Sequence, residues 1–289
     1  ARGQLDEALR IRREQQLPVF TRLDDVRELA IAHGRIGDIL QARGQLDEAL
    51  RTRREQELPV YTRLGDVREL AITYGKIADI LQARGQLDEA LRIRRELQLP
   101  VFTRLDDVRS LANTHSKIAD ILQARGQLDE ALRIHREQLL LVYTRLDDVH
   151  SLAVTHGKIA DILFAQGQSA EAREIQLRAL DGLRALGDKR EIAAAAWSLA
   201  SYDLRDDEPE TAMPLIVEAW NLVTELGVAD GIATVGATLG SILLTNAMPD
   251  QARAVLTQAL AAARLLDMID YIAHIQSRLD SLPPQEPTA

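Results

Sequence analysis

The chain has 289 residues, of which 46% are hydrophobic, so it can bury a substantial core and is not expected to be disordered. A formal net charge of −9 and an aromatic content of 3% argue against binding to nucleic acid or anionic membranes, which need a basic surface or stacking rings. There is no cysteine and no apolar run long enough to span a bilayer, so we expect a soluble cytoplasmic protein without disulfides or thiolate metal sites.

A nine-residue sequence recurs along the chain at a fixed spacing. ARGQLDEAL, residues 1–9, is repeated from Ala42, Ala83 and Ala124, and a diverged copy starts at Ala165. The period of 41 residues is typical of a solenoid, in which each repeat packs on its neighbours. Because the chain lacks an initiator Met and opens within a repeat, we expect it to be the C-terminal part of a longer protein.

The first half of each repeat predicts an amphipathic helix. In one copy, Asp66 can cap the free N–H groups, Glu69 can complete a capping-box-like pair, and Gly85 can end the helix in a left-handed conformation. Apolar side chains recur between these signals with helical spacing, at Leu70, Tyr74, Ile77, Ala78 and Leu81. The same signals recur in the other copies, as Asp25, Asp107, Asp148 and Asp188 and as Gly44, Gly126 and Gly167.

The second half predicts a longer helix with one irregular turn. The apolar positions after Leu87 and those before Leu105 are out of phase by one residue, which a π-type bulge would absorb. Pro100, which has no N–H to donate, falls just after this slip. The fourth copy keeps the extra residue but has Leu141 instead of proline, and the fifth copy has neither. We therefore predict that the insertion sets the bulge and that proline only stabilises it.

Beyond the fifth copy the sequence diverges, but helical periodicity persists. First-turn signals at Asp188, Pro209 and Pro249 support helices at about 169–186, 189–205, 209–226, 231–246, 249–267 and 270–281. No segment predicts a strand, so the predicted fold class is all-α. We predict near-identical repeats over 1–166, divergent repeats with a C-terminal capping helix over 167–282, and a disordered tail over 283–289.

Three features resemble tetratricopeptide repeats: the turn glycine, a small residue in the middle of the first helix, and an alanine in the second helix. The small residues are Gly37, Ala78, Ala119, Ala160, Ala200 and Gly240, and the alanines are Ala49, Ala90, Ala131, Ala172, Ala212 and Ala252. The long unit is similar to the extended repeats of kinesin light chains and of sensor arrays in bacterial signalling ATPases.

The sequence also departs from the family pattern at three points. The consensus proline at the end of the unit is missing. The family's aromatic residue in the first helix is kept as Tyr74 in one copy and replaced by histidine in three, at His33, His115 and His156. The aromatic residue of the second helix is replaced by Arg12, Arg53, Arg94 and His135. Packing at these positions must therefore differ from the family pattern.

The resemblance implies a right-handed superhelix whose concave groove, lined by the first helices, binds a peptide or protein segment. The side of the first helix opposite its apolar stripe would face this groove and contact the ligand through paired charges and amides. We call the residues on that side the predicted groove residues. They are Arg35, Lys76, Lys117 and Lys158; Asp38, Asp79, Asp120 and Asp161; and Gln41, Gln82, Gln123 and Phe164.

The alternative is that these charges only form a solvated face. Lys76 and Asp79 are three residues apart on one helix and would then pair with each other.

The two tryptophans receive different interpretations. Trp197 aligns with Gly75 on the groove side, where it either anchors a ligand or fills the space beside Ala193–Ala196. Trp220 falls in a second helix and is assigned to the core.

The histidines and arginine pairs are assigned to packing rather than to a site. His33, His115 and His156 occur one per repeat, so they would not converge on one metal ion. Of Arg94 and Arg95, one is expected to donate to a carbonyl of the bulge or to an adjacent aspartate, and the other to lie in solvent.

Together these features favour a non-enzymatic scaffold or sensor array that binds a protein or peptide, without cofactor, metal, nucleic acid or membrane. Two alternatives stay open. The uncapped first repeat could stack on another copy and give a homo-oligomer. The array could also regulate an enzyme domain missing from the N-terminus.

Overall fold

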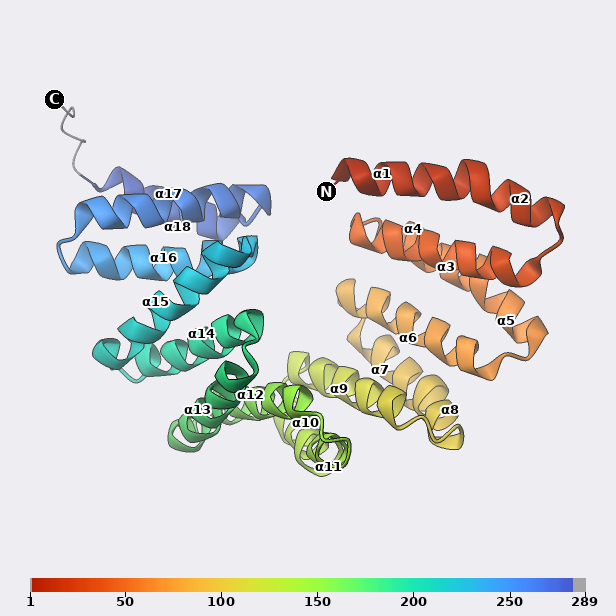
Figure 1. The fold of residues 1–289 in the computed structure, drawn as a ribbon, viewed down its shortest axis with the longest axis horizontal. Coiled ribbons are helices and arrows are strands. Elements are labelled where there is room, and N and C mark those ends of the chain that lie inside the picture. Colours follow the sequence, from red (N-terminus) through yellow and green to blue (C-terminus); the bar gives the residue numbers. More distant parts are fainter. Residues whose placement is uncertain (1, 283–289) are drawn as a thin grey trace. The chain divides into compact units, whose positions relative to one another are not determined.

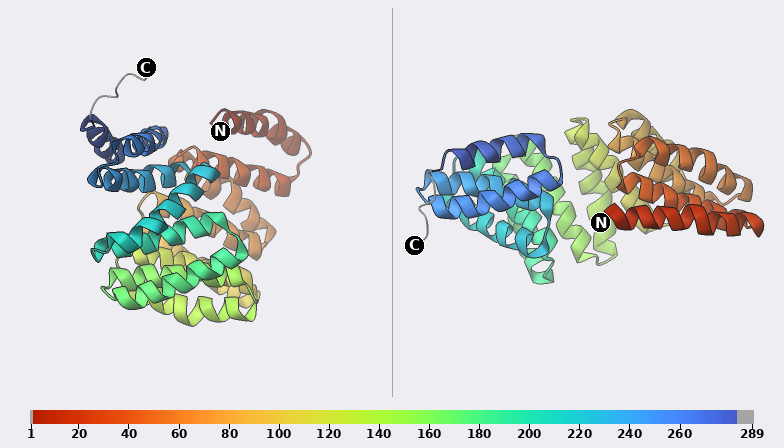
Figure 2. Two further views of the ribbon diagram at one scale, coloured as in Figure 1. Left: turned by 60° about the vertical axis from the view of Figure 1, so that its left-hand side comes forward. Right: turned by 90° about the horizontal axis from the view of Figure 1, so that it is seen from above.

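The computed structural model describes residues 2–282, and all regular structure in this range is helical (Figures 1 and 2). The all-α prediction is confirmed. The chain divides into two compact units, residues 1–145 and 146–289, which are described separately. The tail predicted over 283–289 lies outside the described residues.

The first unit is a series of helical hairpins. Three helices of 17 residues are the predicted first helices of repeats: α3 (Val26–Ala42), α6 (Val67–Ala83) and α9 (Val108–Ala124). Each second helix consists of an α-helical piece, a five-residue π-helix and another α-helical piece. These are α1 (Arg2–Ile11), η1 (Arg12–Gln16) and α2 (Leu17–Arg22); α4 (Leu46–Thr52), η2 (Arg53–Glu57) and α5 (Leu58–Leu64); α7 (Leu87–Ile93), η3 (Arg94–Gln98) and α8 (Leu99–Arg104); and α10 (Leu128–Ile134), η4 (His135–Leu139) and α11 (Leu140–Arg145).

The second unit contains only regular α-helices. First helices of repeats are α12 (Val149–Ala165), α14 (Lys189–Arg205), α16 (Ala229–Thr245) and α18 (Ile269–Asp280), and second helices are α13 (Ser169–Leu186), α15 (Pro209–Leu226) and α17 (Pro249–Leu265). The predicted bounds of these helices differ from the observed ones by at most two residues. The helices pack as the hairpins α12–α13, α14–α15 and α16–α17, as Figure 1 shows.

The helix-capping prediction is confirmed in five repeats. The carboxylate of Asp66 accepts a hydrogen bond from the Glu69 N–H at 3.2 Å, and Asp25, Asp107, Asp148 and Asp188 make the same contact in their helices. The reciprocal half of the capping box is wrong, because the Asp66 N–H donates to the Tyr61 carbonyl instead. Gly85 has a φ of +75°, as predicted for a residue that ends the helix.

The predicted bulge is present in each of the four copies that carry the extra residue. At η3 the Leu99 N–H donates to the carbonyl of Arg94, five residues earlier, instead of four. The fourth copy forms the same π-helix although it has Leu141 in place of proline, and α13, which lacks the insertion, is regular. The insertion therefore sets the bulge, as predicted.

Replacing Pro100 by Leu, the residue of the fourth copy, is expected to leave η3 intact. The leucine adds one backbone donor, which stabilises the folded state by about 1 kcal/mol. It also raises the conformational entropy of the unfolded chain, which destabilises the folded state by a similar amount. The free energy of unfolding, measured by urea titration, should therefore change by no more than about 1 kcal/mol. A loss of about 3 kcal/mol would show that proline is needed to hold the π-helix.

Small residues allow the two helices of a repeat to approach closely. The alanines of the second helix, from Ala49 to Ala252, are all fully buried. The small residues of the first helices lie at the same contact between the two helices of a hairpin. A side chain at Gly240, for example, would come within 2.4 Å of Leu256. The features that carried the family resemblance are therefore the ones that set the hairpin packing.

Ion pairs join successive repeats of the first unit at equivalent positions. The exposed arginine that follows the buried one in each π-helix pairs with the next second helix, as Arg13–Glu48, Arg54–Glu89 and Arg95–Glu130 at 2.5–2.7 Å. Two further series repeat in the same way, as Arg27–Asp66 and Arg68–Asp107, and as Arg43–Asp6, Arg84–Asp47 and Arg125–Asp88. The second arginines are therefore exposed, as expected, and each also pairs with a glutamate of the next repeat.

Candidate functional site

The predicted groove residues of the first unit lie on one side of α3, α6 and α9, but several serve the fold. Lys76 contacts Asp38 of the preceding repeat at 3.3 Å, which is not the pairing with Asp79 that the alternative reading expected. Arg35 is exposed and Lys117 half-exposed. The amides Gln41, Gln82 and Gln123 are half-buried, and Asp120 also has a partner.

Asp38 and Asp79 hold buried arginines of the π-helices. The side chain of Arg94 is only 3% exposed and donates to Asp79 at 2.5 Å and to Gln98 at 3.0 Å. Arg53 donates to Asp38 at 2.6 Å and to Glu57 at 2.7 Å. The prediction that one arginine of a pair binds an adjacent aspartate is confirmed for the first arginine of two pairs, Arg53 and Arg94, whereas Arg12 donates to Gln16.

The last residue of each π-helix fills the space beside the first helix. A side chain at Gly75 would come within 2.2 Å of the Gln98 amide, and one at Gly34 within 2.7 Å of the Glu57 carboxylate. Burial raises the pKa of Glu57, and Arg53 opposes this effect. Gly75 is therefore covered by Gln98 and does not open onto a groove.

In the second unit the predicted groove residues meet an aromatic cluster. Phe164 is only 8% exposed and stacks on Tyr202 with ring centroids 4.1 Å apart, and the Arg205 guanidinium lies 4.6 Å from the Phe164 ring. The Tyr202 hydroxyl donates to Asp161 at 2.6 Å, and burial raises the pKa of Asp161. Phe164 is thus a packing residue on this helix.

Trp197 is half-buried and lines a pocket of about 260 Å³, which we call the Trp197 pocket. Its other walls come from α14, the end of α15 and the start of α16. They include Ala193, Ala194, Val223, Leu226, Thr234 and Val235, with Arg190 and Asp230 also lining it. Trp220 packs against α16, since a side chain at Gly236 would come within 2.6 Å of its ring.

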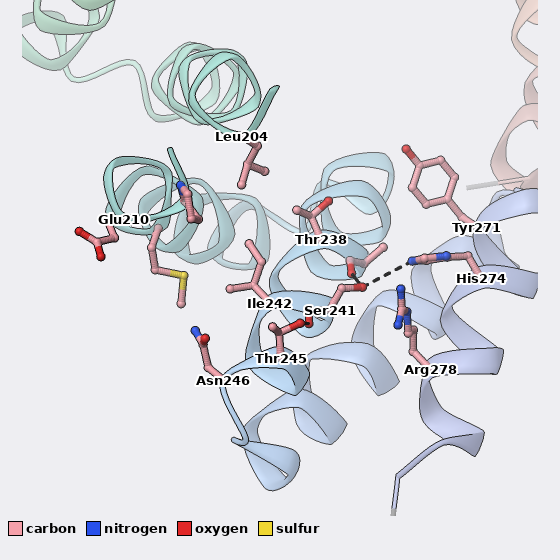
Figure 3. Close-up of a pocket in the computed structure, with 13 residues that line it drawn as sticks. Leu204, Glu210, Thr238, Ser241, Ile242, Thr245, Asn246, Tyr271, His274 and Arg278 are labelled. Carbon is pink, nitrogen blue, oxygen red and sulfur yellow. Dashed lines mark hydrogen bonds between the residues drawn. The ribbon is translucent and has the colours of Figure 1, made fainter. Parts of the chain in front are cut away.

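A larger pocket of about 870 Å³ lies between α14, α15, α16 and α18, and we call it the Arg278 pocket (Figure 3). Thr238, Ser241 and Ile242 of α16 face His274 and Arg278 of α18 across it. Arg278 makes no ion pair within the described part of the chain. The lining also includes Leu204, Glu210, Met213, Thr245, Asn246 and Tyr271.

The Ser241–His274 contact in this pocket does not form a nucleophile–base pair. The Ser241 Oγ lies 3.5 Å from His274 Nε2, at the limit of a hydrogen bond. Its proton is directed instead to the Ala237 carbonyl, at 2.8 Å.

The two pockets meet on one face of α16. Thr234 lines the Trp197 pocket, and Thr238, one helical turn later, lines the Arg278 pocket. The hydroxyls of Thr234, Thr238, Ser241 and Thr245 each donate to a backbone carbonyl four residues earlier, at 2.8–3.4 Å. Their oxygen lone pairs are therefore left to accept hydrogen bonds from a ligand.

Sequence reasoning missed these α16 and α18 residues, although one signal was present. Counted from the helix start, Thr238 and Ser241 occupy the positions that Lys76 and Asp79 occupy in α6. At these equivalent positions α16 carries hydroxyl side chains in place of charges.

The three repeat histidines are half-buried in their helices, and burial lowers the pKa of His33, His115 and His156. Among the described residues, no three His, Asp or Glu side chains converge in a way that could hold a metal ion. No helix within residues 2–282 is long and apolar enough to cross a membrane.

These histidines are expected to make stability depend on pH. Their pKa lies below the ordinary value of 6.5, so the folded state favours the neutral ring, and stability falls as pH falls through 6.5. Asp161 and Glu57 have raised pKa values and act in the opposite sense. Replacing all three histidines by Tyr, the residue at Tyr74, should flatten the change in urea midpoint between about pH 7 and about pH 5.5. An equal change in both proteins would contradict this assignment.

Helical hairpins repeated every 40 or 41 residues define an all-α repeat solenoid. The model of the tetratricopeptide repeat family matches residues 110–185, and the similar solved structures include tetratricopeptide-like repeat proteins. The resemblance inferred from the sequence is confirmed. No curated protein matches the chain.

Three solved structures illustrate the shared fold. BtubC (BKLC) from P. vanneervenii is 19% identical, with a TM-score of 0.60, over 74% of this chain and 92% of that one. A Rap protein complexed with Competence and Sporulation Factor is 14% identical, with a TM-score of 0.61, over 88% and 74%. A signal transduction ATPase with a tetratricopeptide repeat sensor, from Pyrococcus horikoshii, is 15% identical, with a TM-score of 0.62, over 96% and 47%.

Proposed function

We propose that the chain is a non-catalytic protein-interaction scaffold whose second unit binds an extended peptide segment along α16. The observation that carries this proposal is the meeting of the Trp197 and Arg278 pockets on one face of that helix. An apolar pocket beside one that carries hydroxyls and an arginine suits a peptide, which has apolar and polar groups at short intervals.

Each part of the site has a distinct role in this proposal. The Trp197 pocket receives an apolar side chain, because its walls are mostly alanine, valine and leucine around an indole ring. The α16 hydroxyls accept hydrogen bonds from peptide N–H groups. Arg278 pairs with a carboxylate of the segment, since it makes no ion pair within residues 2–282.

The Rap protein complexed with Competence and Sporulation Factor supports a binding role for this fold. At 14% identity this comparison shows a shared fold and does not indicate which ligand the present chain binds.

Selection from a library of displayed random peptides on the full chain tests the proposal. The wild-type chain should enrich a common motif, and Thr238→Trp, which fills the shared face of α16, should abolish enrichment. Thr257→Trp, on an exposed site of α17 outside both pockets, is the matched control and should leave enrichment unchanged. Enrichment that survives Thr238→Trp would reject α16 as the binding face.

A further inference from the structure

The pocket beside Trp197 has an equivalent in the preceding repeat. There, α12, α13 and α14 enclose about 200 Å³, lined by corresponding positions of the first and second helices. Gly157 takes the place of Trp197, and Gln176 takes the place of the fully buried Ile216. We call this space the Gln176 pocket. It shares Ala194 with the Trp197 pocket, so the two are neighbours on α14.

The lining of the Gln176 pocket is polar where its neighbour is apolar. Gln176 is only 2% exposed, and its Nε2 donates to the Ala195 carbonyl at 3.2 Å. Its Oε1 is buried and accepts no hydrogen bond from the described residues. A buried acceptor in this state is costly unless a donor reaches it.

Two carboxylates complete the set of acceptors. Asp161 of α12 and Glu191 of α14 line the same pocket, and Asp161 already accepts a hydrogen bond from Tyr202. The charged groups of the lining are these two and Lys158, which interacts with Asp161. The lining therefore carries one more negative than positive charge.

We infer that the Gln176 pocket, as part of the peptide site proposed above, receives the primary ammonium group of a lysine side chain in the bound segment. An ammonium has three donors and no acceptor, and it meets oxygens from α12, α13 and α14. Its charge balances the excess carboxylate, which a neutral or acidic side chain does not. The bound segment thus carries a lysine next to the apolar side chain that enters the Trp197 pocket.

The first test uses the same displayed peptides on the full chain. Wild-type selections should show lysine at a fixed distance from an apolar residue. Gln176→Ile, which installs the residue of the next repeat, should remove the lysine preference and weaken a lysine-containing peptide about tenfold, while keeping the apolar preference. Trp197→Gly, the reciprocal control, should keep lysine and lose the apolar residue. Selections without lysine, or lysine retained in Gln176→Ile, would overturn the inference.

The second test does not need a peptide and so separates this inference from the proposed function. Titration of the full chain with n-butylammonium, followed by NMR, should give saturable shifts of the backbone amide signals of Gly157 and Ala195, which line the Gln176 pocket. Butanol at equal concentration should give no saturable shifts, and the Gln176→Ile variant should bind neither n-butylammonium nor butanol. Equal shifts with butanol, or no shift with n-butylammonium, would reject the ammonium site even if peptides bind. Saturable n-butylammonium shifts without any peptide enrichment would support the ammonium site and reject the peptide scaffold.

Discussion

Asp79→Ala is expected to lower the free energy of unfolding by about 3 kcal/mol. Asp79 supplies a carboxylate to Arg94, whose side chain is only 3% exposed, so the substitution leaves a buried cation that keeps a side-chain hydrogen bond to Gln98 and the more distant charge of Asp120. The value is placed at the low end for a broken buried ion pair because the Asp79 side chain is itself 32% exposed. Urea unfolding followed by circular dichroism measures it.

The chain contains its own control for this experiment. Asp38→Ala removes the equivalent carboxylate one repeat earlier, but there Arg53 keeps an ion pair with Glu57 at 2.7 Å. The loss should therefore be clearly smaller than for Asp79→Ala. Arg95→Ala, which removes an exposed partner of Glu130, should change stability by about 1 kcal/mol or less. Equal losses for Asp38→Ala and Asp79→Ala would contradict the role given to Glu57.

Trp197→Ala is expected to weaken the peptide selected by the wild-type chain at least about thirtyfold, which is the effect of losing a tryptophan anchor worth about 2 kcal/mol. The indole lines a pocket and is half-buried, so its removal enlarges the pocket more than it disturbs the core. Fluorescence anisotropy of the labelled peptide measures the affinity.

Trp197→Phe provides the graded control, because it keeps an aromatic surface of reduced size. Its affinity should fall between those of the wild-type chain and Trp197→Ala, with the circular dichroism spectrum unchanged in all three. An affinity that does not change in Trp197→Ala would assign this residue to packing beside Ala193–Ala196, which is the other reading that its sequence position allows.

The fold could be predicted in detail because its signals are local. A capping aspartate, a turn glycine and helical spacing fix the helix bounds, and counting residues against the fifth copy was enough to find the π-helices. The reciprocal cap at Asp66 was missed, because its N–H is used by a carbonyl of the preceding turn, which the spacing does not reveal.

The site could be predicted only in outline, because it depends on which side chains fill the space between helices. The alignment of Trp197 with Gly75 is correct, yet Gly75 is covered by the Gln98 amide from η3. In α14 and α15 no π-helix is present, and the same position opens onto a pocket. Likewise, Asp38 and Asp79 of the first unit hold buried arginines, so replacing these two aspartates would test the fold and not the ligand.

The series of ion pairs between repeats has a consequence for how such an array changes in length. Excision of residues 46–86 would join Gln45 to Leu87 and place Glu89 opposite Arg13, Asp107 opposite Arg27, and Arg94 beside Asp38. Each of these three severed ion pairs would then be replaced by a chemically identical one. Recombination within the coding sequence can therefore shorten or lengthen the first unit in whole repeats without creating a mismatched junction.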